Sequence, residues 1–209
     1  MPPALIFEIE ECLFDTRVLR AQALHAALAH EGIECSLPQV LAAHAGAPAS
    51  VAMQQLDEAR ALDAVGADLV LRRAADAARD AIARGAPVFD AAVRDAIERL
   101  AGDFPLAVVT RAERSDAQHL LELAGLDASV RTIRSLADVD RIDHHRVWEE
   151  ARRRTHAARG VALAPGALLG AARQAGLATV QVGDGPDAAA CPRLVSLATV
   201  DASFIASLD

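Results

Sequence analysis

The order of strand-like and helix-like segments is the feature that most constrains the fold of this chain. A short apolar run, "ALIF" at residues 4–7, has the pattern of a buried strand. Residues 16–88 then carry only helical periodicity, and the next strand pattern is "PLAVVT" at residues 105–110. From there helix and strand patterns alternate, which predicts a parallel, doubly wound α/β sheet. We therefore expect a Rossmann-like core from residues 1–15 and 89–209, with an all-helical cap, residues 16–88, inserted after strand 1.

The individual elements of the core follow from apolar periodicity and from Gly and Pro punctuation. Gly125 and Gly176 are expected to end helices, and Pro165 is expected to open one as its first residue. The predicted helices span about residues 90–101, 114–124 and 144–158, and the later predicted strands lie near residues 129–133, 160–164 and 177–183.

Composition and charge exclude several classes of function. The net charge of −8 argues against nucleic acid as a partner. The sequence contains no lysine, so no lysine can act as a base or bind a phosphate group. No apolar stretch approaches the roughly 20 residues of a membrane helix, and the amino terminus lacks the pattern of a signal peptide. Three cysteines without metal or disulfide spacing favour a reducing, cytoplasmic location.

Acidic residues follow the first predicted strand directly. In "ALIFEIEECLFDT", residues 4–16, the apolar run leads into Glu8, Glu10 and Glu11. Ligands and catalytic groups of open α/β sheets lie beyond the carboxyl ends of the strands. We therefore expect Glu8 and Glu10 to lie in the functional site, beneath or beside the helical insert.

Four segments in order resemble the motifs of the haloacid dehalogenase-like superfamily, in its helical-cap branch of phosphohydrolases. They are "ALIFEIEECLFDT", "PLAVVTRAERSDAQHLLELAGL", "DRIDHHRVWEEARRR" and "AARQAGLATVQVG". The resemblance implies a two-step phosphoryl transfer: a first aspartate attacks phosphorus, and a second acid two residues later moves protons. It also implies Mg²⁺ held by carboxylates, with a threonine and a lysine that bind the phosphoryl oxygens.

The first motif departs from the family pattern at its catalytic positions. Glu8 stands where the resemblance places the nucleophile, and Glu10 where it places the acid/base. Each keeps a carboxylate but moves it by roughly 1–1.5 Å, a displacement that can cost about a hundredfold in rate. Glu11 replaces a glycine that allows a sharp turn. Cys12 lies among these acids, which would raise rather than lower its thiol pKa.

The second and third motifs supply the remaining candidate residues. Thr110 matches the hydroxyl at the end of the second strand. Arg111 follows it and points either into the pocket or to solvent. Arg141 stands at the position of the motif lysine, where it is either a surface residue or a partner for a carboxylate. We predict that Arg141, helped by Arg111, pairs with Glu8 and takes the place of a missing cation.

The fourth motif is expected to have lost its metal-binding acids. The acidic pair should lie near residues 163 and 164, where this chain has Leu163 and Ala164. Mg²⁺ needs oxygen ligands, so we expect no metal cofactor. Asp184 and Asp187, in "GDGPD", lie one strand too late for that motif and are interpreted either as a turn or as a substitute metal site.

Two functions remain open at this point. The first is an inactive relative of the phosphohydrolases that acts as a ligand-binding or interaction module, for which a small anionic molecule is the expected ligand class. The alternative is a divergent hydrolase that acts on a small phosphorylated metabolite through Glu8 and Glu10. Neither the ligand nor the oligomeric state follows from the sequence.

Overall fold

A parallel six-stranded sheet forms the centre of the α/β part of the molecule. The computed structural model describes residues 2–14, 16–44, 49–56, 59, 61–85, 90–183 and 191–208, with Arg141 described by its backbone alone. In these ranges the sheet has the order β3-β2-β1-β4-β5-β6, and every neighbouring pair is parallel. The strands are β1 (Ala4–Glu8), β2 (Leu106–Thr110), β3 (Val130–Ser135), β4 (Gly160–Ala164), β5 (Ala178–Val182) and β6 (Arg193–Leu194). The predicted doubly wound α/β fold is therefore confirmed.

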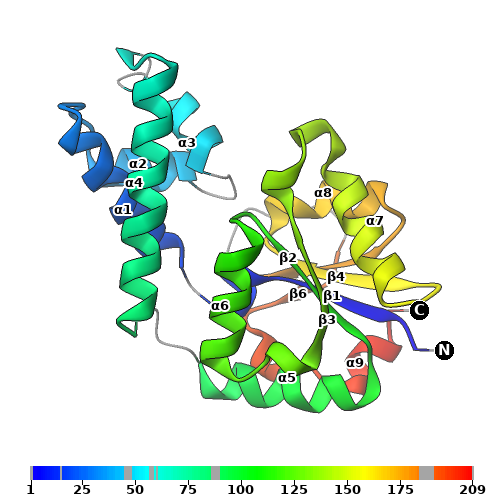
Figure 1. The fold of residues 1–209 in the computed structure, drawn as a ribbon. Helices are drawn as coiled ribbons and strands as arrows, with labels where there is room; N and C mark the ends of the chain where they lie inside the picture. Colours follow the sequence, from blue (N-terminus) through cyan, green and yellow to red (C-terminus); the bar gives the residue numbers. More distant parts are fainter. Residues whose placement is uncertain are drawn as a thin grey trace. The chain divides into compact units, whose positions relative to one another are not determined.

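Helices cover both faces of this sheet (Figure 1). On one face lie α7 (His144–Arg154) and α8 (Gly166–Gln174), and on the other lie α5 (Ala91–Asp103), α6 (Arg114–Ala124) and α9 (Ala202–Ala206). Trp148 of α7 is fully buried, in a cluster with small strand residues such as Ala107 and Ala162. Every residue of β1, β2 and β4 is buried, which explains their nearly continuous apolar runs.

The topological switch point lies between β1 and β4. From β1 the chain passes outward to β2 and β3, and then crosses back to β4, β5 and β6. Glu8 pairs in register with Val109, so the ends of β1 and β2 lie side by side. Phe7 pairs with Leu163 on the other flank, one residue before the end of each strand. This crevice is where open α/β sheets bind ligands.

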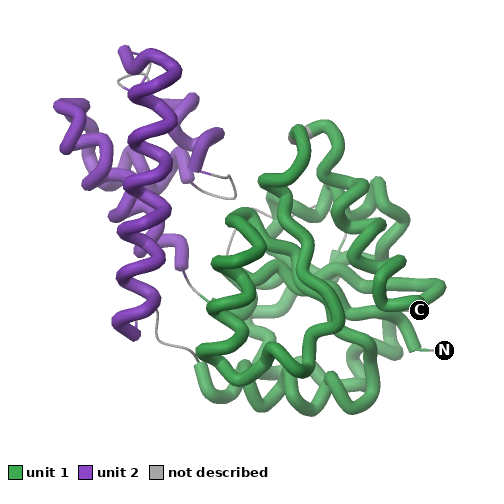
Figure 2. The backbone as a smooth tube through the Cα atoms, in the orientation of Figure 1, with its two compact units in different colours: residues 1–14, 89–209 green, residues 15–88 purple. Residues whose placement is uncertain are grey.

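The chain divides into two compact units (Figure 2). The first contains Met1–Phe14 and Phe89–Asp209, and the second is Asp15–Val88. In its described residues the second unit is helical, with an apolar core that includes Leu24, Leu28 and Val70. Its helices are α1 (Arg17–His30), α2 (Leu37–His44), α3 (Ala49–Gln55) and α4 (Ala64–Ala83). None of the helices described in either unit is long and apolar enough to cross a membrane.

Several element boundaries differ from the expected ones. Helix α7 ends at Arg154 rather than near residue 158, because the Thr155 hydroxyl donates to the Arg152 carbonyl at 2.6 Å and His156 adopts a φ of 61°. Pro165 is the N-cap of α8 and not its first helical residue. Strand β3 continues to Ser135, and β6 and α9 were not expected at all.

Candidate functional site

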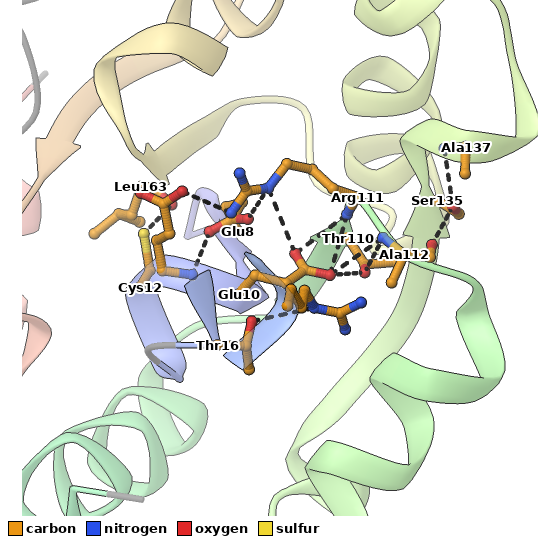
Figure 3. Close-up of polar contacts among 12 residues, drawn as sticks. Glu8, Glu10, Cys12, Thr16, Thr110, Arg111, Ala112, Ser135, Ala137 and Leu163 are labelled. Atoms are coloured by element: carbon orange, nitrogen blue, oxygen red, sulfur yellow. Dashed lines mark hydrogen bonds and ion pairs between the residues drawn. The ribbon is translucent and has the colours of Figure 1, made fainter. Parts of the chain in front are cut away.

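The carboxyl end of β1 turns directly into a short π-helical segment, η1 (Ile9–Leu13). Glu8 is both the last strand residue and the N-cap of this segment, because its Oε2 accepts a hydrogen bond from the Glu11 backbone N–H at 2.8 Å. Glu8 and Glu10 are 0% and 1% exposed. The three acidic residues therefore lie in one turn, and Glu8 and Glu10 are buried in the protein. Figure 3 shows these two side chains among their polar contacts.

The Arg111 side chain lies among these carboxylates. Its Nε donates to Glu8 Oε1 at 2.8 Å and lies 4.0 Å from Glu10 Oε2, while a terminal nitrogen lies 2.8 Å from Glu11 Oε1. Only 7% of the Arg111 side chain is exposed. The sequence left two orientations open for the Arg111 side chain, into the site or toward solvent. In the structure it points into the site.

The Glu10 carboxylate accepts hydrogen bonds from the end of β2. Its Oε1 accepts from the Thr110 hydroxyl and, at 3.2 Å each, from the backbone N–H groups of Arg111 and Ala112. Its Oε2 also lies 3.2 Å from the Arg111 N–H. We call the three donors, which are the Thr110 hydroxyl and the Arg111 and Ala112 N–H groups, the strand-end cradle.

Electrostatics at this site are dominated by burial and by mutual contact. Burial raises the pKa of Glu8 well above its ordinary value; Arg111 opposes that rise, and Glu10 and Glu11 add to it. Burial alone would lower the pKa of Arg111, but Glu8, Glu10 and Glu11 outweigh it and raise that pKa. The site holds three carboxyl groups around one guanidinium, so repulsion among the carboxylates adds to the effect of burial on the pKa of Glu8.

Cys12 points away from the polar cluster, toward β4. Its thiol lies 3.5 Å from the Leu163 carbonyl oxygen and donates to it. Burial first, and then the charges of Glu8 and Glu11, raise the pKa of Cys12 well above its ordinary value. A raised pKa disfavours the thiolate, so Cys12 is not an activated nucleophile.

The structure brings together Glu8, Glu10, Thr110 and Arg111 of the five candidate residues. Arg141 begins a single 3-10 turn, η5 (Arg141–Asp143), but its side chain lies outside the described part of the structure, as do Asp184 and Asp187. Whether Arg141 pairs with Glu8 therefore stays a prediction. The described chain contains no group of three or more His, Cys, Asp or Glu residues placed to hold a metal ion.

Two contributors were missed from the sequence. Glu11 was interpreted only as a lost glycine, yet it forms an ion pair with Arg111. Ser135 is buried at the end of β3; its hydroxyl donates to the Ala112 carbonyl at 2.5 Å and accepts from the Ala137 N–H at 3.0 Å. The signal for Ser135, a hydroxyl residue at a strand end, was hidden because strand β3 was predicted to stop two residues earlier.

Comparisons with known proteins agree with this architecture. Solved structures with the same fold include a β-phosphoglucomutase from Clostridium difficile, with a TM-score of 0.82, 11% identity and coverage of 100% of this chain and 97% of that one. CbbY from Rhodobacter sphaeroides, solved in complex with phosphate, has a TM-score of 0.80 and 18% identity, with 95% of this chain and 96% of that one covered. A predicted phosphoglycolate phosphatase from Haemophilus somnus has a TM-score of 0.75 and 18% identity over 94% of this chain and 95% of that one.

Comparisons of the sequence alone find fewer matches than comparisons of the fold. None of the curated proteins with which the sequence was compared matches it. The model of one family, described as haloacid dehalogenase-like hydrolase, matches residues 5–166, which include β1, the helical unit, β2, β3 and β4. The predicted resemblance is therefore confirmed, and the chain belongs to the haloacid dehalogenase-like hydrolase family.

Proposed function

We propose that this protein does not catalyse magnesium-dependent phosphoryl transfer. It acts instead as a binding or interaction module with the hydrolase fold. The observation that carries the proposal is the buried Arg111 guanidinium, which is in contact with Glu8 and Glu11 at 2.8 Å each. A cation built into the chain at this point balances the carboxylates that would otherwise attract a metal ion.

The described residues do not fit the Mg²⁺ that the family implies. Mg²⁺ requires near-octahedral oxygen ligands at about 2.0–2.1 Å. The Glu8 carboxylate is engaged on both oxygens, by Arg111 Nε and by the Glu11 N–H. At the adjacent end of β4, Leu163 and Ala164 are fully buried and carry no side-chain oxygen.

Attack by Glu8 on a phosphorus atom is disfavoured for the same reasons. A carboxylate nucleophile must be ionised and must present a free oxygen to the substrate. Here the pKa of Glu8 is raised, chiefly by burial, and both of its oxygens already accept hydrogen bonds. An anionic ligand, the class suggested by the family, would also meet the carboxylates of Glu10 and Glu11.

A divergent hydrolase is the second candidate, and one observation favours it. A carboxyl group with a raised pKa can remain protonated near neutral pH and donate a proton to a leaving group. In that mechanism Glu8 would be a general acid rather than a nucleophile. Cytoplasmic location is part of either proposal, supported by Cys12, Cys35 and Cys191, which are thiols and not disulfides.

A turnover assay distinguishes the two candidates. The full chain is assayed against an aryl phosphate and a panel of sugar and short-chain acid phosphates, with Mg²⁺ and with a chelator. We expect no release of phosphate above that of a Glu8→Gln variant prepared in the same way. Robust release that disappears in Glu8→Gln would overturn the proposal and establish the divergent hydrolase.

A further inference from the structure

The outer edge of strand β3 is open in the described structure. β3 lies at one end of the sheet, and among the described strands only β2 pairs with it (Figure 1). The backbone groups along the outer side of an edge strand can pair with a further strand, and many proteins bind extended peptides in this way. This edge is therefore a candidate interaction surface.

A groove of about 370 Å³ lies at this edge, between β3 and α6. Four successive residues of β3, residues 130–133, line it. Successive side chains of a strand point to opposite faces of the sheet, so a groove lined by all four follows the strand edge rather than one face. From α6 the groove is lined by Arg114, Gln118 and the fully buried Leu121, whose spacings of four and three residues place them on one helical face. Strand addition needs this combination of a free edge and a surface for alternate side chains.

One irregularity sets where regular pairing can begin. The register of β3 against β2 shifts so that Arg131 stands between the paired residues Val130 and Thr132. An extra residue of this kind leaves the ladder of hydrogen bonds and bends the strand locally. A strand added at the outer edge would therefore pair regularly from Thr132 onward.

Arg131 is the cation that this edge offers to a partner. Its side chain is exposed, and its Nη1 donates to the Thr155 carbonyl at 3.4 Å. No carboxylate of the described chain pairs with it. Opposite charges on neighbouring strands stabilise their pairing, so an acidic side chain on an added strand is favoured here.

The other charges at the edge argue against a second copy of this chain as the occupant. Arg134 of β3 pairs with Glu150 at 3.0 Å. Arg114 pairs with Asp138 at 2.6 Å, and Asp127 is a carboxylate in the groove lining. β3 itself contains two arginines and no acidic residue. Two copies joined through β3 would bring two basic strands together, and like charges on paired strands are destabilising.

We propose that the groove between β3 and α6 is a docking site for an extended, acidic segment of a partner protein, which adds to the sheet as a strand beside β3. Acidic side chains of the segment meet Arg131, and apolar ones meet Leu121. Neither Glu8 nor Glu10 lines the groove. The inference therefore goes beyond the proposed function and holds whatever chemistry the crevice beside β1 performs.

Nuclear magnetic resonance of the full chain tests the docking site with a capped hexapeptide in which Glu alternates with Val. We expect saturable shifts of the amide resonances of Thr132, Ile133 and Gln118, larger than those in β5 or in the helical unit. A peptide in which Lys alternates with Val is the control for charge and should bind about tenfold more weakly. The acidic peptide with N-methyl groups at alternate residues keeps its charge but loses backbone donors, and it should also bind about tenfold more weakly. Equal binding of the N-methylated peptide would show attraction without strand addition and overturn the proposal.

A pair of variants tests the charge of the site. Arg131→Glu should weaken binding of the acidic peptide by about fivefold. Arg72→Glu, on an exposed position of α4, changes the net charge equally and should leave the affinity as it is. An equal loss in both variants, or no saturable shift in the unmodified chain, overturns the proposal.

Dilution of the chain without peptide tests the remaining occupant. Resonances of Thr132 and Ile133 should not move with protein concentration. Movement confined to them would assign the edge to a second copy of this chain and overturn the proposal. Turnover of phosphate esters, in contrast, would overturn the proposed function alone, whatever the groove binds.

Discussion

Glu10 carries one methylene more than an aspartate would, and that methylene decides what its carboxylate reaches. The additional bond extends the side chain by about 1.5 Å. With this reach the carboxylate meets the Thr110 hydroxyl and the N–H groups at the end of β2. The glutamate at position 8 gains the same reach, and one of its oxygens turns back to the Glu11 N–H. The site is thus satisfied by contacts within the chain.

Arg111 is the residue whose loss should cost most stability. Arg111→Ala leaves Glu8 and Glu11 without their cation, and removing one partner of a buried pair costs about 3–5 kcal/mol. Urea denaturation at pH 7 measures this cost.

The matched control for that loss is Arg114→Ala. Arg114 pairs with Asp138 where both side chains are about half exposed, so its loss should cost less than about 1 kcal/mol. Adding Glu8→Gln to Arg111→Ala should restore part of the stability. Equal costs for the two arginine variants would contradict a buried ion pair at Arg111.

Glu8 should make stability depend on pH in a defined direction. Its pKa is raised in the folded protein, chiefly by burial, so its contribution is present below the unfolded pKa and is lost as the pH rises through the folded pKa. Glu8→Gln does not ionise and escapes this loss. The difference in unfolding free energy, Glu8→Gln minus wild type, should therefore grow as the pH rises above the ordinary pKa of a glutamate. Denaturation at several pH values measures this difference in unfolding free energy. Glu98→Gln, on the exposed face of α5, is the control. A difference for Glu8→Gln that does not change with pH would contradict a raised pKa of Glu8.

At the scale of the elements, the periodic segments could be predicted and the tertiary contacts could not. The sequence located β2, α6 and β4 within a residue or two, because long apolar patterns and Gly125 mark them. It missed β6, which has two residues and no pattern to detect. At the site, the sequence predicted that Glu8, Glu10 and Thr110 lie at one edge of the sheet. It did not predict that the Arg111 side chain points inward, because that orientation depends on burial and charge, which no local sequence pattern reports.

Two glycines at helix ends should respond to alanine in opposite directions. Gly125 is the C-cap of α6 with a φ of 70°, which strains any residue with a Cβ, so Gly125→Ala should destabilise by about 1 kcal/mol. Gly102 lies within α5, where an added Cβ meets no atom within 4 Å, so Gly102→Ala should stabilise by about 0.5–1 kcal/mol. Thermal unfolding of both variants measures the signs. A stabilising Gly125→Ala would mean that α6 ends differently in solution.

For the whole molecule, the fold is that of the haloacid dehalogenase-like hydrolase family, and the described charges at the site come from residues of the chain itself. The sheet order, the helical unit after β1 and the crevice beside β1 are those of a haloacid dehalogenase-like hydrolase. Within the described residues, Arg111 supplies the positive charge at the crevice and Glu10 supplies the anion in the cradle. Both ions of the site are therefore part of the chain, which predicts a protein whose stability does not depend on added Mg²⁺.

Thermal unfolding of the whole protein with and without Mg²⁺ tests that independence. A metal bound with a Kd of about 1 mM would, at about 10 mM, stabilise the folded chain by about 1.4 kcal/mol. For a protein of this size that energy raises Tm by roughly 3–6 °C. We expect Mg²⁺ to change Tm by less than about 1 °C. The Arg111 guanidinium already forms an ion pair with Glu8, and the end of β4 offers no carboxylate. A larger rise that vanished in Glu8→Ala would place a metal in the crevice and contradict the charge argument. A rise that vanished only in Asp184→Ala would place the metal on the segment after β5, and the crevice itself would remain independent of it.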